Sequence, residues 1–449
     1  MNNLFICFLF ILFFFIVYFF LKNSITLINT ESLLLIYLLF CSAIYYVLNT
    51  ELVVISFLDG NVFVQNDKFS DFVQLQYSFT EILGPDNYGS YGKFKKWDTV
   101  QNNAYLNNIG NNEKLTLFPV VNIINISIAH VINISTITIE NFYFLYMFCL
   151  VSILIRHIYV ISKSMIVAIS AVGFYPLFFA IERGNHLSII VTLLLGQFFI
   201  QNIIKQKPLS IIDAMLLSLA ISIRPNLIFL VLILFVNKDR KESFLNISKA
   251  SLTFVFVNFI SYILVLLSYP KYKILQSFEV FLEYSGEISI ISNYFNSSLF
   301  RFVIGVFNIS DINLSFIQRF TFINILFFIT ISILMTFLTT KRVGEINETR
   351  LYLFILLYVL SITVSNPIIM YHFLLFGYFL LALNTLNYHR NSFLIYCLFI
   401  ILLPKIFNNP YMPFTSWGLY LNQIAFLGLS IFLIYLLSLK KQKNTHRIF

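Results

Sequence analysis

Charged residues and cysteines are scarce in this chain, and both shortages exclude classes of protein. Only 11% of its residues are charged, so no soluble domain of ordinary size fits between the apolar runs. The four cysteines, Cys7, Cys41, Cys149 and Cys397, all lie inside apolar runs, which excludes a disulfide framework and a spaced metal motif. Ten-residue segments of alternating polarity are also missing, which argues against a transmembrane β-barrel.

Long apolar runs take up most of the chain instead. The 449 residues are 59% hydrophobic and 18% aromatic, with a mean hydropathy of +0.84. Runs of about 18 residues or more recur, and a helix of this length crosses the hydrocarbon core of a bilayer. The sequence therefore predicts an all-α, polytopic bundle of about 12 to 14 transmembrane spans.

The expected spans can be placed by residue number. They cover residues 4–21, 33–48, 141–157, 164–181, 187–204, 209–223, 226–237, 247–268, 314–340, 350–364, 370–387, 392–403 and 418–438. We divide the chain into N-terminal spans (1–58), an outer catalytic loop with partly embedded helices (59–140), a main bundle (141–438) with an outer loop at 269–312, and a basic cytoplasmic tail (439–449).

The net charge of +9 is explained by topology rather than by a nucleic-acid partner. Lys and Arg fall mostly in short breaks between spans, such as 205–207, 238–241 and 341–342, and this is the positive-inside pattern of cytoplasmic loops. Residues 117–135 are apolar but contain three Asn and one His, so we expect an embedded or re-entrant segment there. The prediction is a multi-pass protein of the cell (inner) membrane with its C-terminus inside and its N-terminus outside.

The break at Glu182-Arg183-Gly184-Asn185 interrupts two apolar segments with an acid and a base. Charges at membrane depth are costly, and such residues usually face a cavity, a partner or water. The planar fork of Arg183 suits a phosphate, and the amide of Asn185 suits sugar hydroxyls. The alternative is an interfacial Glu182–Arg183 pair that merely separates two spans.

Four further polar clusters fall on the same expected outer face. Asp71 follows Ser70, a candidate helix cap, and could act as a general base on an acceptor hydroxyl. Arg224 precedes Pro225 at the end of a span, although snorkelling alone could explain it. Asn296 ends the second outer loop, and His372 begins the span 370–387; both have ordinary structural readings too.

The order of these motifs resembles a known family. The motifs are Asp71-Phe72 followed after four residues by Tyr77, then Leu117-Phe118-Pro119, Tyr175-Pro176, Arg183-Gly184-Asn185, Arg224-Pro225, Asn296-Ser297-Ser298-Leu299 and Pro367 with Tyr371-His372. Over about residues 60 to 390, the chain is similar to the GT-C membrane glycosyltransferases of glycosyltransferase family 87, the polyprenyl-phosphate-mannose-dependent mannosyltransferases. It departs from them at Phe118-Pro119 (Tyr-Pro-Pro in the family), at Arg224-Pro225 (Lys-Pro) and in having two hydrophobic runs before the acidic loop.

The resemblance implies inverting transfer of a mannose-like hexose from a polyprenyl-phosphate sugar to an envelope glycan or glycolipid on the outer face. Asp71 would be the base, and Arg183, Asn185, Arg224, Asn296, His372, Tyr77 and Glu182 would bind substrate. No metal and no cofactor are expected. An O-antigen-type polymerase remains an alternative, as does a transporter or flippase of lipid-linked saccharides.

Overall fold

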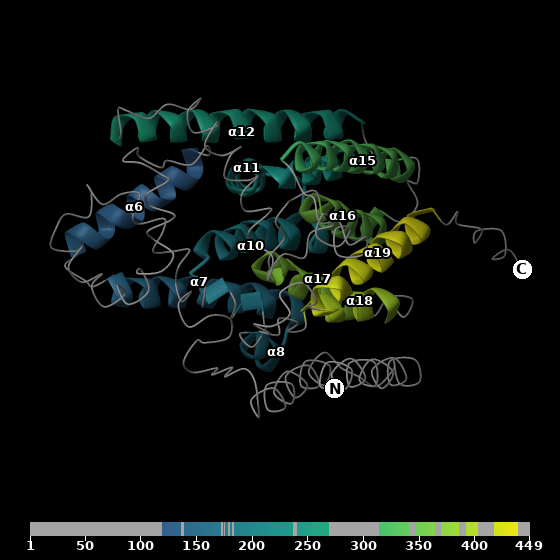
Figure 1. Ribbon diagram of the computed structural model, residues 1–449, viewed down its shortest axis with the longest axis horizontal. Coiled ribbons are helices and arrows are strands. Elements are labelled where there is room, and N and C mark those ends of the chain that lie inside the picture. Colours follow the sequence, from purple (N-terminus) through teal and green to yellow (C-terminus); the bar gives the residue numbers. More distant parts are fainter. Residues whose placement is uncertain are drawn as a thin grey trace, which may run out of the picture.

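The computed structural model describes residues 119–135, 139–171, 184–236, 240–268, 314–340, 346–363, 370–385, 392–402 and 417–438, with Phe174, Pro176, Leu177, Ala180 and Ile181. Secondary structure in these residues is helical, and none of them lies in a strand. Figure 1 shows α12 and α15 at the top of the view, α7, α8 and α18 at the bottom, and α10, α16 and α17 between them. The described part of the chain is therefore an all-α bundle.

The α-helices are α6 (Pro119–Ser135), α7 (Ile139–Ser162), α8 (Met165–Ser170), α10 (His186–Phe198), α11 (Ile211–Ile223), α12 (Arg240–Ser268), α15 (Leu314–Thr340), α16 (Ile346–Thr363), α17 (Leu374–Thr385), α18 (Ser392–Leu402) and α19 (Trp417–Ser438). Three further helical segments are not α-helices. They are the π-helix η3 (Phe199–Ile204) and the 3₁₀-helices η4 (Pro225–Phe235) and η5 (Met370–Phe373).

Helix α15 has several polar residues on its buried face and large apolar residues on its exposed face. Its buried face includes Asn324, Ser332, Thr336 and Thr339. Its exposed face includes Phe322, Ile323, Leu326, Phe327, Ile333, Leu334 and Phe337. An apolar surface this extensive needs an apolar solvent or a partner. Four helical stretches of the described residues, in α7, α10–η3, α12 and α15, are long and apolar enough to cross a bilayer. The chain is thus a multi-pass helical membrane protein.

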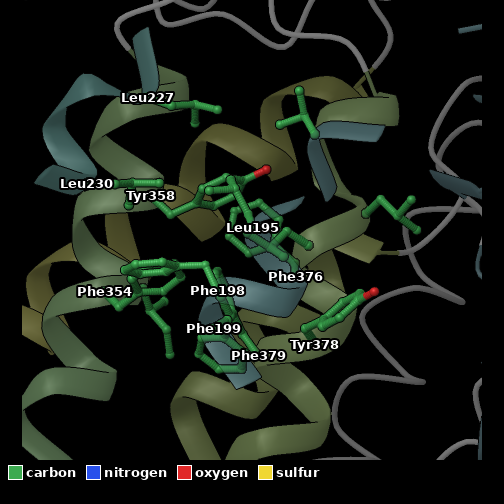
Figure 2. Close-up of a cluster of buried hydrophobic side chains, with 14 of the residues drawn as sticks. Leu195, Phe198, Phe199, Leu227, Leu230, Phe354, Tyr358, Phe376, Tyr378 and Phe379 are labelled. Atoms are coloured by element: carbon green, nitrogen blue, oxygen red, sulfur yellow. The ribbon is translucent and has the colours of Figure 1, made fainter. Parts of the chain in front are cut away.

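Two helices, α16 and α17, form the centre of the bundle. Every residue of 351–363 and of 373–383 is buried. Aromatic rings fill the space between these helices and α10–η3, as Phe354, Phe379 and Phe199 show in Figure 2. The Phe354 and Phe379 rings lie edge to face with centroids 5.8 Å apart. This packing fixes α10, α16 and α17 relative to one another, and these helices carry the candidate site.

The helices have two distinct ends, which we call the Leu209 end and the Arg224 end. At the Leu209 end, Lys249 Nζ donates to the Leu209 carbonyl at 3.0 Å, and Ser243 Oγ donates to the Phe235 carbonyl at 3.2 Å. The start of α11 and the end of η4 are therefore both beside the start of α12. Helices α11 and η4 form a hairpin, and its tip at Arg224 lies at the opposite end.

The basic breaks gather at the Leu209 end. Lys205 and Lys207 follow η3, and Arg240 and Lys241 begin α12; all four are exposed. The hydrogen bond from Lys249 to Leu209 brings these two connections together. The prediction that these basic breaks share one end of the bundle is confirmed for the connections described here.

The expected spans 4–21 and 33–48 lie outside the described residues, and most of the others coincide with helices, but one differs. The expected span 164–181 is not one helix, because α8 ends at Ser170 and Phe174 is non-helical. Proline disfavours a helical residue before it, and Pro176 follows this break in the helix. In addition, Figure 1 shows that α6 runs obliquely to its neighbours. The embedded or re-entrant role of this segment stays a prediction.

Candidate functional site

The tip of the α11–η4 hairpin places Arg224 at the centre of the candidate site. Arg224 has an extended backbone (φ −134°, ψ 91°), as expected for a residue that precedes proline, and Pro225 starts η4. The Arg224 N–H still closes α11 by donating to the Ala220 carbonyl at 2.9 Å. The turn therefore ends one helix, starts the next, and projects a half-buried arginine.

Two side chains from other segments orient the guanidinium of Arg224. Its Nη2 donates to Ser188 Oγ on the first turn of α10, and its Nη1 lies against His372 Nε2 on η5. These residues are 36 and 148 positions away in the sequence. Four helical segments thus meet at one arginine.

The arginine determines the protonation of His372. A guanidinium has donors only, so the Nε2 atom that faces it must be the acceptor of a neutral imidazole with its proton on Nδ1. The backbone of His372 is held as well, because Tyr358 Oη of α16 donates to the His372 carbonyl at 2.7 Å. The buried helix α16 therefore positions η5, and η5 positions the imidazole beside Arg224.

Asn185 has a structural role in this cluster. It is the N-cap of α10, and its Oδ1 accepts from the Ser188 N–H at 3.0 Å and from the Ser188 hydroxyl. Gly184 precedes it with a φ of 75°, a conformation that glycine adopts without strain. The cap holds Ser188 Oγ in place as an acceptor for Arg224. The sequence prediction gave Asn185 to a sugar, and that role stays untested.

A second contact fixes the base of the hairpin tip. Asn226 Nδ2 donates to the Ser361 carbonyl at 2.8 Å, near the end of α16. The Ser361 hydroxyl donates to the Leu357 carbonyl at 2.6 Å, so Asn226 binds the backbone carbonyl of Ser361 rather than its side chain. Both the tip and η5 are therefore attached to α16.

The hairpin is too short to carry Arg224 across a whole bilayer. Helix α11 has 13 residues, so Arg224 lies about 20 Å from its start, whereas the hydrocarbon core is about 30 Å thick. With the Leu209 end at a membrane surface, a hairpin of this length would keep Arg224 inside the bilayer, where a charged residue is a functional-site candidate by default.

The arrangement suits an anionic, phosphate-like group. The guanidinium fork is held on two sides by a hydroxyl and a neutral imidazole. Low local dielectric strengthens the attraction between a guanidinium and a developing negative charge. Among the described residues, no three His, Cys, Asp or Glu side chains group together as metal ligands.

The structure brings together three of the residues singled out in the sequence, Asn185, Arg224 and His372. The predicted residues Asp71, Tyr77, Glu182, Arg183 and Asn296 lie outside the described residues. Sequence analysis did not assign a role to Ser188, Tyr358 or Asn226. Asn226 directly follows the Arg224-Pro225 motif. Comparisons with profiles of protein families, with curated proteins and with solved structures found no match for this chain.

Proposed function

We propose that the chain is a membrane glycosyltransferase that transfers a hexose from a polyprenyl-phosphate sugar to a glycan or glycolipid acceptor. The observation that carries the proposal is the convergence of Asn185, Ser188, Arg224 and His372 from separate segments at one end of the bundle. This convergence gives the bundle an oriented cation, which supports binding of the phosphate of a lipid-linked sugar.

In this proposal the phosphate of the donor lies against Arg224, and Arg183 adds a second cation. Asp71 takes the proton of the acceptor hydroxyl, whose oxygen attacks the anomeric carbon. The bond between that carbon and the phosphate oxygen breaks, and the lipid phosphate leaves with the bonding electrons. An arginine already held in place offsets the charge of the leaving group without reorganisation.

The lipid-facing surface of the bundle supports a lipid-linked donor. Helices α12 and α15 expose large apolar side chains along their lengths, including Phe244, Phe256 and Phe327. A polyprenyl chain is soluble in the same hydrocarbon that covers these helices. A lipid-linked donor would therefore share its solvent with this surface of the bundle.

The test is transfer of labelled mannose from polyprenyl-phosphate mannose by membranes that contain the chain. The wild type should transfer the label, and both Asp71→Asn and Arg224→Gln should lose most of this activity at equal expression. Arg156→Gln is the matched control, because Arg156 is an exposed arginine on α7 in the half that leads to the Leu209 end.

Three results would contradict parts of the proposal. Full activity in Asp71→Asn would remove Asp71 from the role of base. Transfer that needs diphosphate-linked repeat units, with none from the monophosphate donor, would favour a polymerase, and movement of the lipid-linked sugar across the bilayer without transfer would favour a flippase.

A further inference from the structure

Helix α19 has two adjacent polar residues on its buried face. Asn422 and Gln423 are both buried, although the rest of that face is apolar. The Gln423 side chain is 6% exposed, and its Nε2 has no hydrogen-bond partner among the described residues. A buried amide donor without a partner is unfavourable, and in native proteins such a group usually meets water or a ligand.

Aromatic contacts place these two polar residues near η5. Phe426 lies three residues after Gln423, so the two side chains share one face of α19. The Phe426 ring lies 5.3 Å from the ring of Phe373 and 5.9 Å from that of Phe376. Phe373 is the last residue of η5 and directly follows His372.

The direction of α19 puts Gln423 on the same side of this contact as His372. Further along α19, Phe432 contacts Phe393 with ring centroids 5.0 Å apart, and Phe393 is the second residue of α18, which follows α17 in the chain. Helix α19 therefore runs parallel to α17. His372 precedes Phe373 in η5, and Gln423 lies one turn before Phe426 in α19. Both residues are therefore on the N-terminal side of the Phe373–Phe426 contact.

We propose that Gln423 is a further ligand-binding residue of the Arg224 site and that its Nε2 donates to a hydroxyl oxygen of the donor's sugar ring. The inference rests on the proposed function. An uncharged amide suits an uncharged oxygen, whereas the phosphate is matched by the guanidinium. Gln423 would then allow the site to distinguish a lipid-linked hexosyl phosphate from a lipid phosphate without sugar.

The test compares two probes, polyprenyl phosphate and polyprenyl-phosphate mannose, by their effect on the thermal unfolding of the purified full chain. Each bound lipid should raise the unfolding midpoint, and in the wild type the mannosyl lipid should raise it more. Gln423→Leu and the unbranched Gln423→Met should both lose this extra shift, corresponding to roughly fivefold weaker binding of the mannosyl lipid. Their response to polyprenyl phosphate should stay unchanged.

The matched control is Asn324→Leu, which removes another buried amide whose Nδ2 has no partner among the described residues, on a different helix. It should keep the extra mannosyl shift. If either Gln423 variant also keeps it, or if the wild type responds equally to both lipids, the role of Gln423 is overturned while the proposed donor survives. If the wild type responds to neither lipid, the proposed function loses its donor, and the Gln423 inference fails with it.

Discussion

At the scale of single residues, the proposed role of Arg224 depends on how its guanidinium is held rather than on its charge alone. Its two fork nitrogens meet Ser188 and His372, and each of these is fixed in turn, by the Asn185 cap and by Tyr358 of α16. A lysine would keep the charge but could not make both contacts in the same plane. Orientation and charge can therefore be separated by mutation.

We expect Arg224→Lys to lower hexose transfer by about 100-fold, the magnitude found when one preorganised charge-stabilising donor is removed from an active site. Arg156→Lys, an exposed position on α7, should remain close to the wild type. Initial rates at saturating acceptor and matched protein levels would measure both. Equal activity of Arg224→Lys and the wild type would mean that the held fork is unimportant.

The sequence predicted the residues of this cluster that break an apolar pattern and missed those that do not. Arg224 and His372 are polar or charged at the edges of apolar runs, so their cost in a membrane makes them visible. Ser188 is a small hydroxyl within an apolar run, where most serines bond to the preceding helical turn. Only the fold shows that its hydroxyl faces Arg224, because the two residues approach through tertiary packing.

At the scale of helices, close approach depends on small residues. Helix α10 meets α17 at Gly196, where a Cβ atom would lie 2.6 Å from Cε1 of Tyr378. The Tyr378 ring is fully buried, and its hydroxyl lies 3.2 Å from His157 Nδ1 on α7, so the ring has little freedom to move. Small residues allow such approaches between membrane helices.

Gly196→Ala should therefore destabilise the bundle by about 1 to 3 kcal/mol, the usual penalty of overpacking. Thermal unfolding in detergent would show this as a lower midpoint. Gly428→Ala on α19 is the control, because its Cβ would lie at 3.4 Å from the Phe393 ring and 3.6 Å from Cys397 Sγ. Equal midpoints for the two variants would show that α10 and α17 are not in close contact at Gly196.

Hydropathy located the long helices well and the short ones less well. The expected span 314–340 matches α15 (Leu314–Thr340), because a full-length apolar run between polar breaks leaves little choice of ends. The 3₁₀ form of η4 and the π form of η3 were not foreseen. Apolar composition is the same for all three helix types, so a hydropathy pattern does not distinguish them.

At the scale of the whole molecule, the two ends of the bundle differ in charge and in chemistry. Lys205, Lys207, Arg240 and Lys241 are exposed at the Leu209 end, whereas the Arg224 cluster lies at the other. Basic connections favour the cytoplasmic side of a membrane. We therefore propose that the Arg224 cluster lies towards the outer face.

Cysteine labelling tests this orientation. Lys207→Cys should react with a membrane-impermeant maleimide from the cytoplasmic side only, whereas Pro225→Cys, exposed next to Arg224, should react only from the outside or not at all. A tag at Phe449 should be accessible from the same side as position 207. Labelling of Lys207→Cys in intact cells would reverse the topology and move the site to the cytoplasm.

The most direct measurement is an experimental structure of the full chain with bound polyprenyl-phosphate mannose. We predict that the phosphate oxygens lie within hydrogen-bond distance of the Arg224 guanidinium, about 3 Å, with the polyprenyl chain leaving between helices into the bilayer. A phosphate bound away from Arg224, or an Arg224 fork closed off by protein groups alone while the donor is bound, would contradict the account.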